Sequence, residues 1–165
     1  PRRGARASRA RLANARAEGI AEKPSFRDAF RRRRCVVPAS GFYEWQTIGG
    51  RKFPWYFTRR DGAPLLLAGI WDRWEAPAGA ALETFALVTT EPNAVVAPLH
   101  DRMPVIVPPG EYGRWLDPSL RDPDSLASLL VPFPPDDMLA FPVGTRVNTP
   151  SVDDEGCIAP LTSAR

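Results

Sequence analysis

The sequence predicts an α+β fold, in which a curved, mostly antiparallel sheet or open β-barrel is flanked by a few short helices. Three observations support this class: short aromatic and apolar segments recur along the chain, turn residues separate them, and few stretches follow the helical period. Of the 165 residues, 44% are hydrophobic and 25% are charged, as in ordinary globular domains. We therefore expect residues 1–165 to form a single domain.

The N-terminal part of the chain predicts an arm, a short helix and a buried strand. Residues 1–13 show weak periodicity and are expected to form an exposed arm. Ser25 and Asp28 have the spacing of a helix capping box, which predicts a helix over residues 26–33. Residues 35–37, Cys-Val-Val, are typical of a short buried strand.

From residue 42 onward the pattern is that of strands joined by turns. Gly49-Gly50 and Asp61-Gly62 are turn signals, and the second is typical of a β-hairpin. Proline is favoured in the first turn of a helix, so Pro109 and Pro123 indicate helix starts. The expected strands are residues 42–46, 53–58, 65–74, 83–90, 103–107 and 139–143, and the expected helices are residues 109–116 and 123–130.

Positive charge is concentrated at the N-terminal end. Residues 1–34 contain 11 Arg and one Lys against three acidic residues, a formal charge of +9, whereas the remaining residues carry −6. Arginine forms bidentate contacts to phosphate and stacks on rings. The asymmetry favours a polyanionic partner, and nucleic acid in particular. A solvated arginine-rich arm without a partner is the alternative.

Composition also excludes several classes of protein. No apolar run reaches 18 residues, and no signal peptide is visible. Two cysteines, Cys35 and Cys157, cannot form a disulfide framework or a four-ligand zinc site, and one histidine leaves little scope for a histidine-based metal centre. We expect a cytoplasmic, nucleoid-associated monomer that uses no metal or organic cofactor and contacts no membrane.

His100 is the first candidate for chemistry because it is the single histidine of the sequence. It lies in a loop that enters a predicted strand, and histidine exchanges protons near neutral pH. Asp101 and Arg102 beside it could set its charge state. A hydrogen-bonded structural histidine is the alternative.

Glu44 is the second candidate. In a strand over residues 42–46, Phe42, Glu44 and Gln46 share one face. A carboxylate bracketed by aromatic residues is partly desolvated, which raises its pKa and suits a general acid or base. A glutamate that points into water from an edge strand fits the sequence equally well.

Asn14 and Arg16 are further candidates, in the run Asn-Ala-Arg-Ala-Glu at residues 14–18. Asparagine offers a donor and an acceptor, and arginine offers a planar fork for phosphate. By itself the run is typical of a helix start or a surface turn. Cys35 is expected to be a small buried residue, although the arginines before it would lower its pKa if it were exposed.

Five segments, taken in order, resemble the SRAP family (SOS response-associated peptidase), whose members recognise abasic sites in single-stranded DNA. Each segment alone is a weak signal, but five in this order over residues 14–107 are a strong match, and residues 143–149 fit more loosely. The segments are NARAE at 14–18, PSFR at 24–27, RCVVP at 34–38, GFYEW at 41–45 and HDRMP at 100–104.

The resemblance implies a mechanism and a set of site residues. In the family, a cysteine at the mature N-terminus, exposed by autoproteolysis, attacks the abasic-site aldehyde and forms a thiazolidine DNA–protein cross-link. At the matching positions, Asn14 would orient the nucleophile or the sugar. Glu44 would move protons at the amine, and His100 would act as acid or base on the sugar ring oxygen. Arg16 and Arg102 would hold flanking phosphates, and no cofactor is implied.

This sequence departs from the family pattern at its start. The Cys-Gly-Arg segment and the Trp-Gly-containing stretch that precede residue 14 in the family have no match here. We expect them to belong to a missing N-terminal segment, so that this chain binds abasic DNA but does not cross-link to it. Two alternatives stay open: a cysteine-type peptidase acting on proteins, and a non-catalytic single-stranded DNA-binding module.

Overall fold

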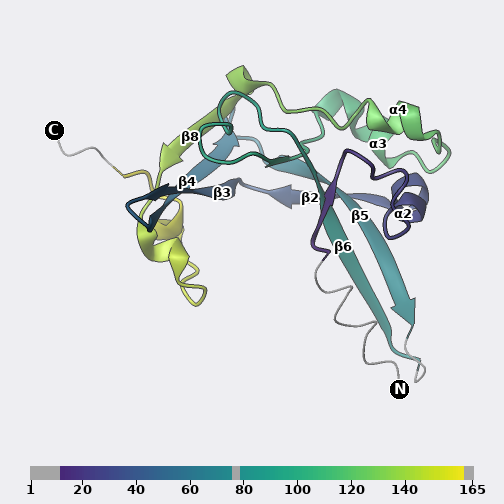
Figure 1. Ribbon diagram of the computed structural model, residues 1–165, viewed down its shortest axis with the longest axis horizontal. Helices are drawn as coiled ribbons and strands as arrows, with labels where there is room; N and C mark the ends of the chain where they lie inside the picture. The colour runs from purple at the N-terminus through teal and green to yellow at the C-terminus, as the bar shows by residue number, and fades with distance from the viewer. Residues whose placement is uncertain (1–11, 76–78, 162–165) are drawn as a thin grey trace.

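The computed structural model describes residues 12–75 and 79–161 and places their strands in two sheets (Figure 1). The larger sheet has the order β1-β6-β5-β2, with β7 also paired to β6, and the smaller sheet has the order β3-β4-β8. The larger sheet contains β1 (Asn14–Arg16), β2 (Arg34–Ala39), β5 (Leu65–Glu75), β6 (Ala81–Thr90) and β7 (Met103–Pro104). The smaller sheet contains β3 (Phe42–Ile48), β4 (Arg51–Arg59) and β8 (Met138–Pro142).

The predicted α+β class with mostly antiparallel strands is confirmed. Among the described strands, β1 and β6 are the parallel pair, with Asn14 opposite Leu87 and Arg16 opposite Thr89. The strand conformation of residues 14–16 corrects the local expectation of a helix start or turn. Three residues carry little intrinsic preference, so the pairing with β6, which is distant in sequence, decides their conformation.

Both predicted turns are present, but the β-hairpin expected at Asp61-Gly62 is not. Gly49 (φ 56°) and Gly50 (φ 76°) both adopt positive φ, as the two-residue turn between β3 and β4 requires. The prediction at Asp61-Gly62 is wrong, because β4 and β5 belong to different sheets. A turn is present, with Gly62 at φ 74° and the Asp61 carboxylate accepting from the Ala63 N–H. It carries the chain from the smaller sheet to the larger one.

The first helix, α2 (Arg27–Arg32), does not have the predicted capping box. It begins after Phe26, and no side chain caps its N-terminus. Ser25 is exposed, and the Asp28 carboxylate lies near Arg27 instead. The helix is fixed by packing, because Phe30 on its inner face is fully buried.

The two predicted proline helix starts are confirmed, but both helices are shorter than expected. Pro109 begins a 3₁₀ turn, η1 (Pro109–Glu111), that leads into α3 (Tyr112–Leu116). Pro123 begins α4 (Pro123–Ala127), and the Asp122 carboxylate caps it by accepting from the Ser125 N–H at 2.8 Å. Three further 3₁₀ turns are η2 (Pro135–Asp137), η3 (Thr145–Asn148) and η4 (Glu155–Cys157).

Two hydrophobic clusters hold the elements together. The first packs α2, α3 and α4 on the larger sheet around Phe30, Trp115 and Leu126. The second contains Phe57 of β4 and Leu65 of β5, so it joins the two sheets. Phe42 at the start of β3 stacks on Phe57, with ring centroids 4.9 Å apart. The next residue on the same face of β3, Glu44, therefore lies at the edge of this cluster, where the two sheets meet.

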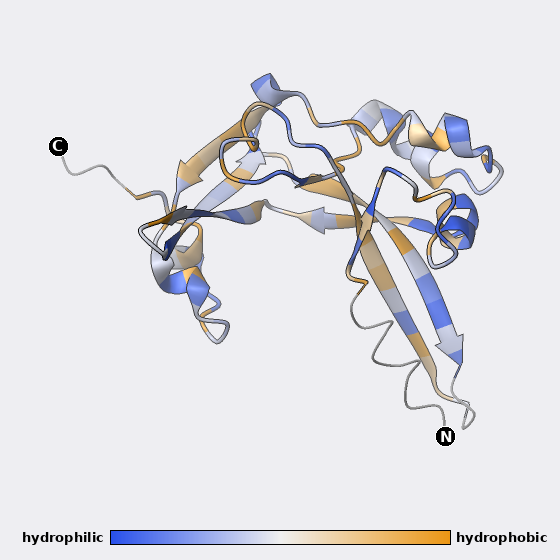
Figure 2. Cartoon of the chain, viewed as in Figure 1, coloured by the Kyte–Doolittle hydropathy of each residue, from blue (hydrophilic) through white to orange (hydrophobic). Residues whose placement is uncertain are grey.

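The far ends of β5 and β6 form a hairpin that projects from the body (Figure 1). Strand β5 changes from hydrophobic in the body to hydrophilic toward Glu75 (Figure 2). On β6, Leu82 and Phe85 are more than half exposed (52% and 56%). The predicted arm over residues 1–13 lies outside the described residues except for its last two. No helix in the described ranges is long and apolar enough to cross a membrane.

Candidate active site

His100 ends a loop that a buried asparagine organises. Asn93 is 7% exposed, and its side-chain oxygen accepts from the N–H of Val96 while its amide donates to Phe133 O at 2.8 Å. The His100 N–H in turn donates to Val96 O. The histidine main chain is therefore fixed by a buried hydrogen-bonded turn, while its side chain remains 45% exposed.

The ring of His100 is oriented by the main chain of Arg102. The Arg102 N–H donates to His100 Nδ1 at 3.0 Å, and Arg102 O lies 3.1 Å from the same nitrogen. A neutral ring whose Nδ1 accepts a hydrogen bond carries its proton on Nε2. A protonated ring would instead donate from Nδ1 to the Arg102 carbonyl. Nε2 is thus the ring nitrogen left to exchange a proton with a substrate.

Glu44, on β3 of the smaller sheet, faces the His100 loop, which joins two strands of the larger sheet. Glu44 Oε1 lies 4.0 Å from His100 Nδ1, although the two residues are 56 positions apart in the sequence. The Glu44 side chain is only 20% exposed, so the reading of a solvent-facing edge-strand glutamate is wrong. Burial raises the pKa of the Glu44 carboxyl, Asp101 adds to that effect, and His100 opposes it. The predicted desolvation of this carboxyl is confirmed, and its raised pKa suits proton transfer.

Arg102 connects this pair to the end of β1. Its Nη1 and Nη2 donate to the two carboxylate oxygens of Glu18, each at 2.9 Å. Nη2 also donates to Thr89 O at 2.5 Å. The Arg102 side chain is 19% exposed, and this is a guanidinium already bound on two sides. Its expected contact with a DNA phosphate stays a prediction.

Asn14 and Arg16 lie on the exposed face of β1, on either side of the buried Ala15. Arg16 is opposite Thr89, the residue that Arg102 also contacts. No hydrogen bond or ion pair within residues 12–75 and 79–161 joins Asn14 to Glu44 or His100. The structure therefore brings Glu44, His100 and Arg102 together and places Asn14 and Arg16 on the adjoining strand.

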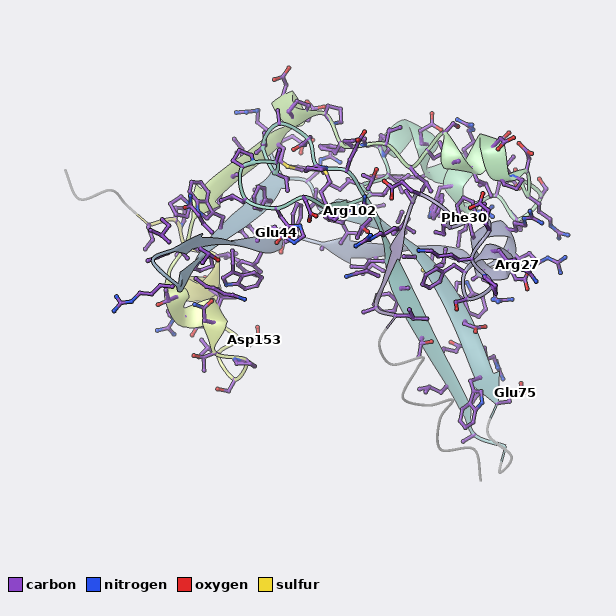
Figure 3. All side chains as sticks on the ribbon, viewed as in Figure 1. Arg27, Phe30, Glu44, Glu75, Arg102 and Asp153 are labelled. Carbon is purple, nitrogen blue, oxygen red and sulfur yellow. The ribbon has the colours of Figure 1, made fainter. Side chains whose placement is uncertain are left out.

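Figure 3 shows Glu44 and Arg102 near the middle of the molecule, between the two sheets, with Arg27 at the right and Asp153 below Glu44. Carboxylates are as prominent as arginines here, because Glu18, Glu44 and Asp101 accompany the two basic residues. The charge of the described site is therefore mixed, and the positive charge expected to attract a polyanion is not concentrated here. The arginines among residues 1–11 lie outside the described part of the chain.

The site is an open surface position at the junction of the sheets. A hollow of about 430 Å³ lies farther along β3 and β4, between Phe53, Trp55 and Pro142. A second, of about 310 Å³, lies at Pro38 and Pro64. Neither is lined by Glu44 or His100.

The two cysteines are not placed to act with this site. Cys35 is partly buried on β2, its sulfur lies close to Gly69, and burial raises the pKa of its thiol. Cys157 is buried, with its sulfur near Val152 O. The raised pKa of Cys35 disfavours the thiolate form that a nucleophile needs, and burial limits access to Cys157. The described residues contain no group of three or more His, Cys, Asp or Glu side chains arranged to hold a metal ion.

Sequence reasoning missed Glu18, Thr89 and Asn93. Glu18 is the last residue of the NARAE segment, and its membership of that segment was the available signal. The partner of its carboxylate lies 84 residues away, so no local pattern reveals the pair. Asn93 shows no sequence feature that separates a buried asparagine from an exposed loop residue.

Comparison with known proteins identifies relatives over most of the chain. The family model described as SOS response associated peptidase (SRAP) matches residues 2–150. The chain is 41% identical over 141 residues to the abasic site processing protein YoqW of Bacillus subtilis, covering 85% of this chain and 63% of that protein. It is 31% identical over 172 residues to the abasic site processing protein HMCES of Gallus gallus, covering 92% of this chain and 51% of that protein.

Solved structures with a similar fold are also related in sequence. A crystal structure of a protein from Bacteroides thetaiotaomicron superposes with a TM-score of 0.84 at 36% identity, over 90% of this chain and 66% of that one. A second, from Bordetella bronchiseptica, has a TM-score of 0.71 at 34% identity, over 79% of this chain and 64% of that one. The chain thus spans about three fifths of YoqW and about half of the chicken protein.

Proposed function

The chain belongs to the SOS response associated peptidase (SRAP) family, and from that premise we propose that it recognises abasic sites in single-stranded DNA and supplies the proton-transfer groups for their processing. The observation that carries this proposal is the approach of Glu44 to His100, at 4.0 Å across the junction of two sheets. Two relatives that cover most of this chain, YoqW and HMCES, are named abasic site processing proteins.

Each member of the pair has a proposed task. An abasic sugar exists mainly as a closed hemiacetal, and it becomes reactive when the ring opens to the aldehyde. His100 would protonate the ring oxygen from Nε2, the nitrogen that its contact with Arg102 leaves free. Glu44, whose pKa is raised by burial, would take a proton from an attacking amine and return it to the departing hydroxyl.

The substrate would be held from β1. Arg16 is exposed and carries a charge for a flanking phosphate, while the Asn14 amide on the same face would hydrogen-bond to the sugar or the nucleophile. Arg102 is the weaker phosphate candidate of the two arginines, because Glu18 already occupies its guanidinium. Such contacts make binding fall steeply with added salt.

The covalent step would use the amine and thiol of an N-terminal cysteine, as the family resemblance implies. The amine adds to the aldehyde, water leaves to give an imine, and the thiol adds to the imine carbon to close a thiazolidine ring. Cys35 and Cys157 lack the exposure that this step needs. We therefore propose that the 165-residue chain binds the lesion but forms no cross-link. The same Glu44–His100 pair would serve autoproteolysis and lyase-type reversal.

Binding of the 165-residue chain to matched oligonucleotides tests this function. One strand carries a tetrahydrofuran abasic analogue, and the control strand is intact. We expect tighter binding to the abasic strand, and weaker binding to both strands by Arg16→Ala. Arg27→Ala is the matched control, since this exposed arginine lies on α2, away from Glu44 (Figure 3). Equal affinity for the two strands would instead favour a lesion-blind DNA-binding module.

The reactive lesion provides the second test. A strand with a natural abasic site, incubated with the same chain and then denatured, should show no adduct. A denaturation-resistant adduct would reveal a nucleophile within residues 1–165 and overturn the proposal that this chain binds the lesion without cross-linking to it. Cleavage of an unrelated peptide that depends on His100 would favour the protein-peptidase alternative.

We place the activity in the cytoplasm, on a monomer beside the nucleoid, in keeping with a DNA substrate.

A further inference from the structure

We propose that Glu18 is a positioning residue that acts through Arg102 to fix the ring orientation and tautomer of His100. The catalytic value of this arrangement rests on the proposed function, whereas the arrangement itself can be measured on the free protein. Glu18 touches no candidate reacting atom. Its carboxylate binds the Arg102 side chain, and the Arg102 main chain contacts the His100 ring.

The side-chain half of this connection is a two-pronged ion pair. Arg102 Nη1 and Nη2 each lie 2.9 Å from a Glu18 oxygen, the fork-to-fork geometry that fixes both groups in one plane. The Arg102 side chain is 19% exposed, and its Nε is buried without a hydrogen-bond partner. Without this carboxylate, which is itself 60% exposed, Arg102 would keep only the Thr89 carbonyl as an anchor, so its position would be less restrained.

The second anchor is the main chain of β6. Arg102 Nη2 donates to Thr89 O at 2.5 Å, and the Ala17 N–H donates to the same carbonyl at 2.8 Å. The guanidinium therefore ties the end of β1 to the end of β6. Glu18 directly follows Ala17. Its carboxylate and the Thr89 carbonyl together fix the position of the Arg102 guanidinium.

The main-chain half of the connection acts on the ring. The Arg102 N–H donates to His100 Nδ1 at 3.0 Å, which favours the tautomer with the proton on Nε2, whereas Arg102 O, 3.1 Å from the same nitrogen, favours a proton on Nδ1. Two other charged groups face the same nitrogen, Asp101 at 3.4 Å and Glu44 at 4.0 Å. Both carboxylates would attract a proton to Nδ1. Without the Arg102 N–H in place, they would favour the opposite tautomer, whose Nε2 has no proton to give.

An alternative role for the pair makes the opposite prediction. If Glu18 merely shielded Arg102 until a phosphate displaced it, removing the carboxylate would free the arginine and strengthen DNA binding. The two anchors on Thr89 and Glu18 argue against a mobile arginine. The two roles are therefore separable by experiment.

The single histidine makes the test direct, since every imidazole signal in an NMR spectrum of the chain belongs to His100. Long-range ¹H–¹⁵N spectra of the ring report the ratio of the two tautomers. The variant is Glu18→Gln, and the control is Glu22→Gln, an exposed glutamate four residues further on. We expect the wild type and the control to show the Nε2–H tautomer, and Glu18→Gln to lower its ratio roughly two- to tenfold, the range for loss of one ordinary hydrogen bond.

Folding of the variants is checked on the amide spectrum of the same samples. If Glu18→Gln does not fold, Arg102→Lys replaces it, because lysine keeps the charge but cannot bind both oxygens at once. An unchanged tautomer ratio in a folded variant overturns the proposal, and so does tighter binding of the abasic-analogue strand with an unchanged ring spectrum. A shifted ratio in a protein without preference for abasic DNA would retain the positioning role and reject the proposed function.

Discussion

Replacing Arg34 should destabilise the protein more than replacing any exposed arginine. Arg34 is 9% exposed, and its guanidinium makes five hydrogen bonds, all to main-chain carbonyls. Arg34 satisfies carbonyls at the C-terminal end of α2 and binds the chain at and after the end of α3. The acceptors are the carbonyls of Phe30, Arg31, Trp115, Asp117 and Leu120.

The size of the effect follows from these bonds. Hydrogen bonds to a charged group contribute about 1.5–3 kcal/mol each, but the sum is offset by the cost of burying the guanidinium. Removing the guanidinium leaves buried carbonyls without a donor, at about 1–3 kcal/mol for each one that water does not reach, so the net loss is about 3–5 kcal/mol. We expect Arg34→Met to lose that amount, which is a large part of a total stability of about 5–15 kcal/mol. The melting temperature should fall by roughly 6–20 °C.

Urea unfolding followed by tryptophan fluorescence measures this loss. The guanidinium lies 5.7 Å from the centre of the Trp115 ring, so the probe is local as well as global. Arg34→Lys should lie between the wild type and Arg34→Met, because an ammonium has three donors for five carbonyls. Arg27→Met is the control, with a side chain 53% exposed, and should stay within about 0.5 kcal/mol. A loss below about 1 kcal/mol for Arg34→Met, at unchanged slope, would refute this reasoning.

Three further predictions concern the site and its surroundings. Because burial raises the Glu44 pKa, ionisation of this carboxyl destabilises the fold. The wild type should therefore lose stability relative to Glu44→Gln as pH rises from the ordinary glutamate pKa through the raised one. Urea unfolding across that pH window measures the loss, and a constant stability difference between the two proteins would contradict the prediction. Gly41→Ala would place a methyl group against the Phe57 carbonyl and the Tyr56 ring, lowering stability by about 1–3 kcal/mol or more in thermal melts, whereas Gly113→Ala, with open space around it, should not. Arg16→Ala should reduce the slope of log affinity for DNA against log salt by about 1, and an unchanged slope in titrations would exclude a phosphate contact.

Most of the strand pattern could be predicted from the sequence, because alternation and turn residues are local signals. Strand β5 was expected over residues 65–74 and extends over Leu65–Glu75, and β8 differs from its expected range by one residue at each end. The pairing of strands was less accessible. Asp61-Gly62 has the chemistry of a hairpin turn, yet the strands beside it choose partners far away in sequence. Residues 14–16 form a strand only because β6 is next to them.

The candidate site was predictable in its residue types but not in its connections. Glu44 was recognisable because aromatic residues flank it, and His100 because it is the single histidine. The link from Glu18 to Arg102 spans 84 residues and depends on the parallel pairing of β1. Likewise, the capping expectation at Ser25 failed because a buried aromatic ring fixed α2 more strongly than a polar cap could.

Glu44 lies on a strand of the smaller sheet and His100 in a loop between two strands of the larger sheet, and that arrangement affects how such a protein can evolve. The separation between the two groups is set by how one layer sits on the other, through the shared packing around Phe57 and Leu65. A substitution in that packing can therefore retune proton exchange while every reacting side chain keeps its identity. Lineages could diverge in speed or lesion preference through changes that a survey of conserved polar residues would never detect.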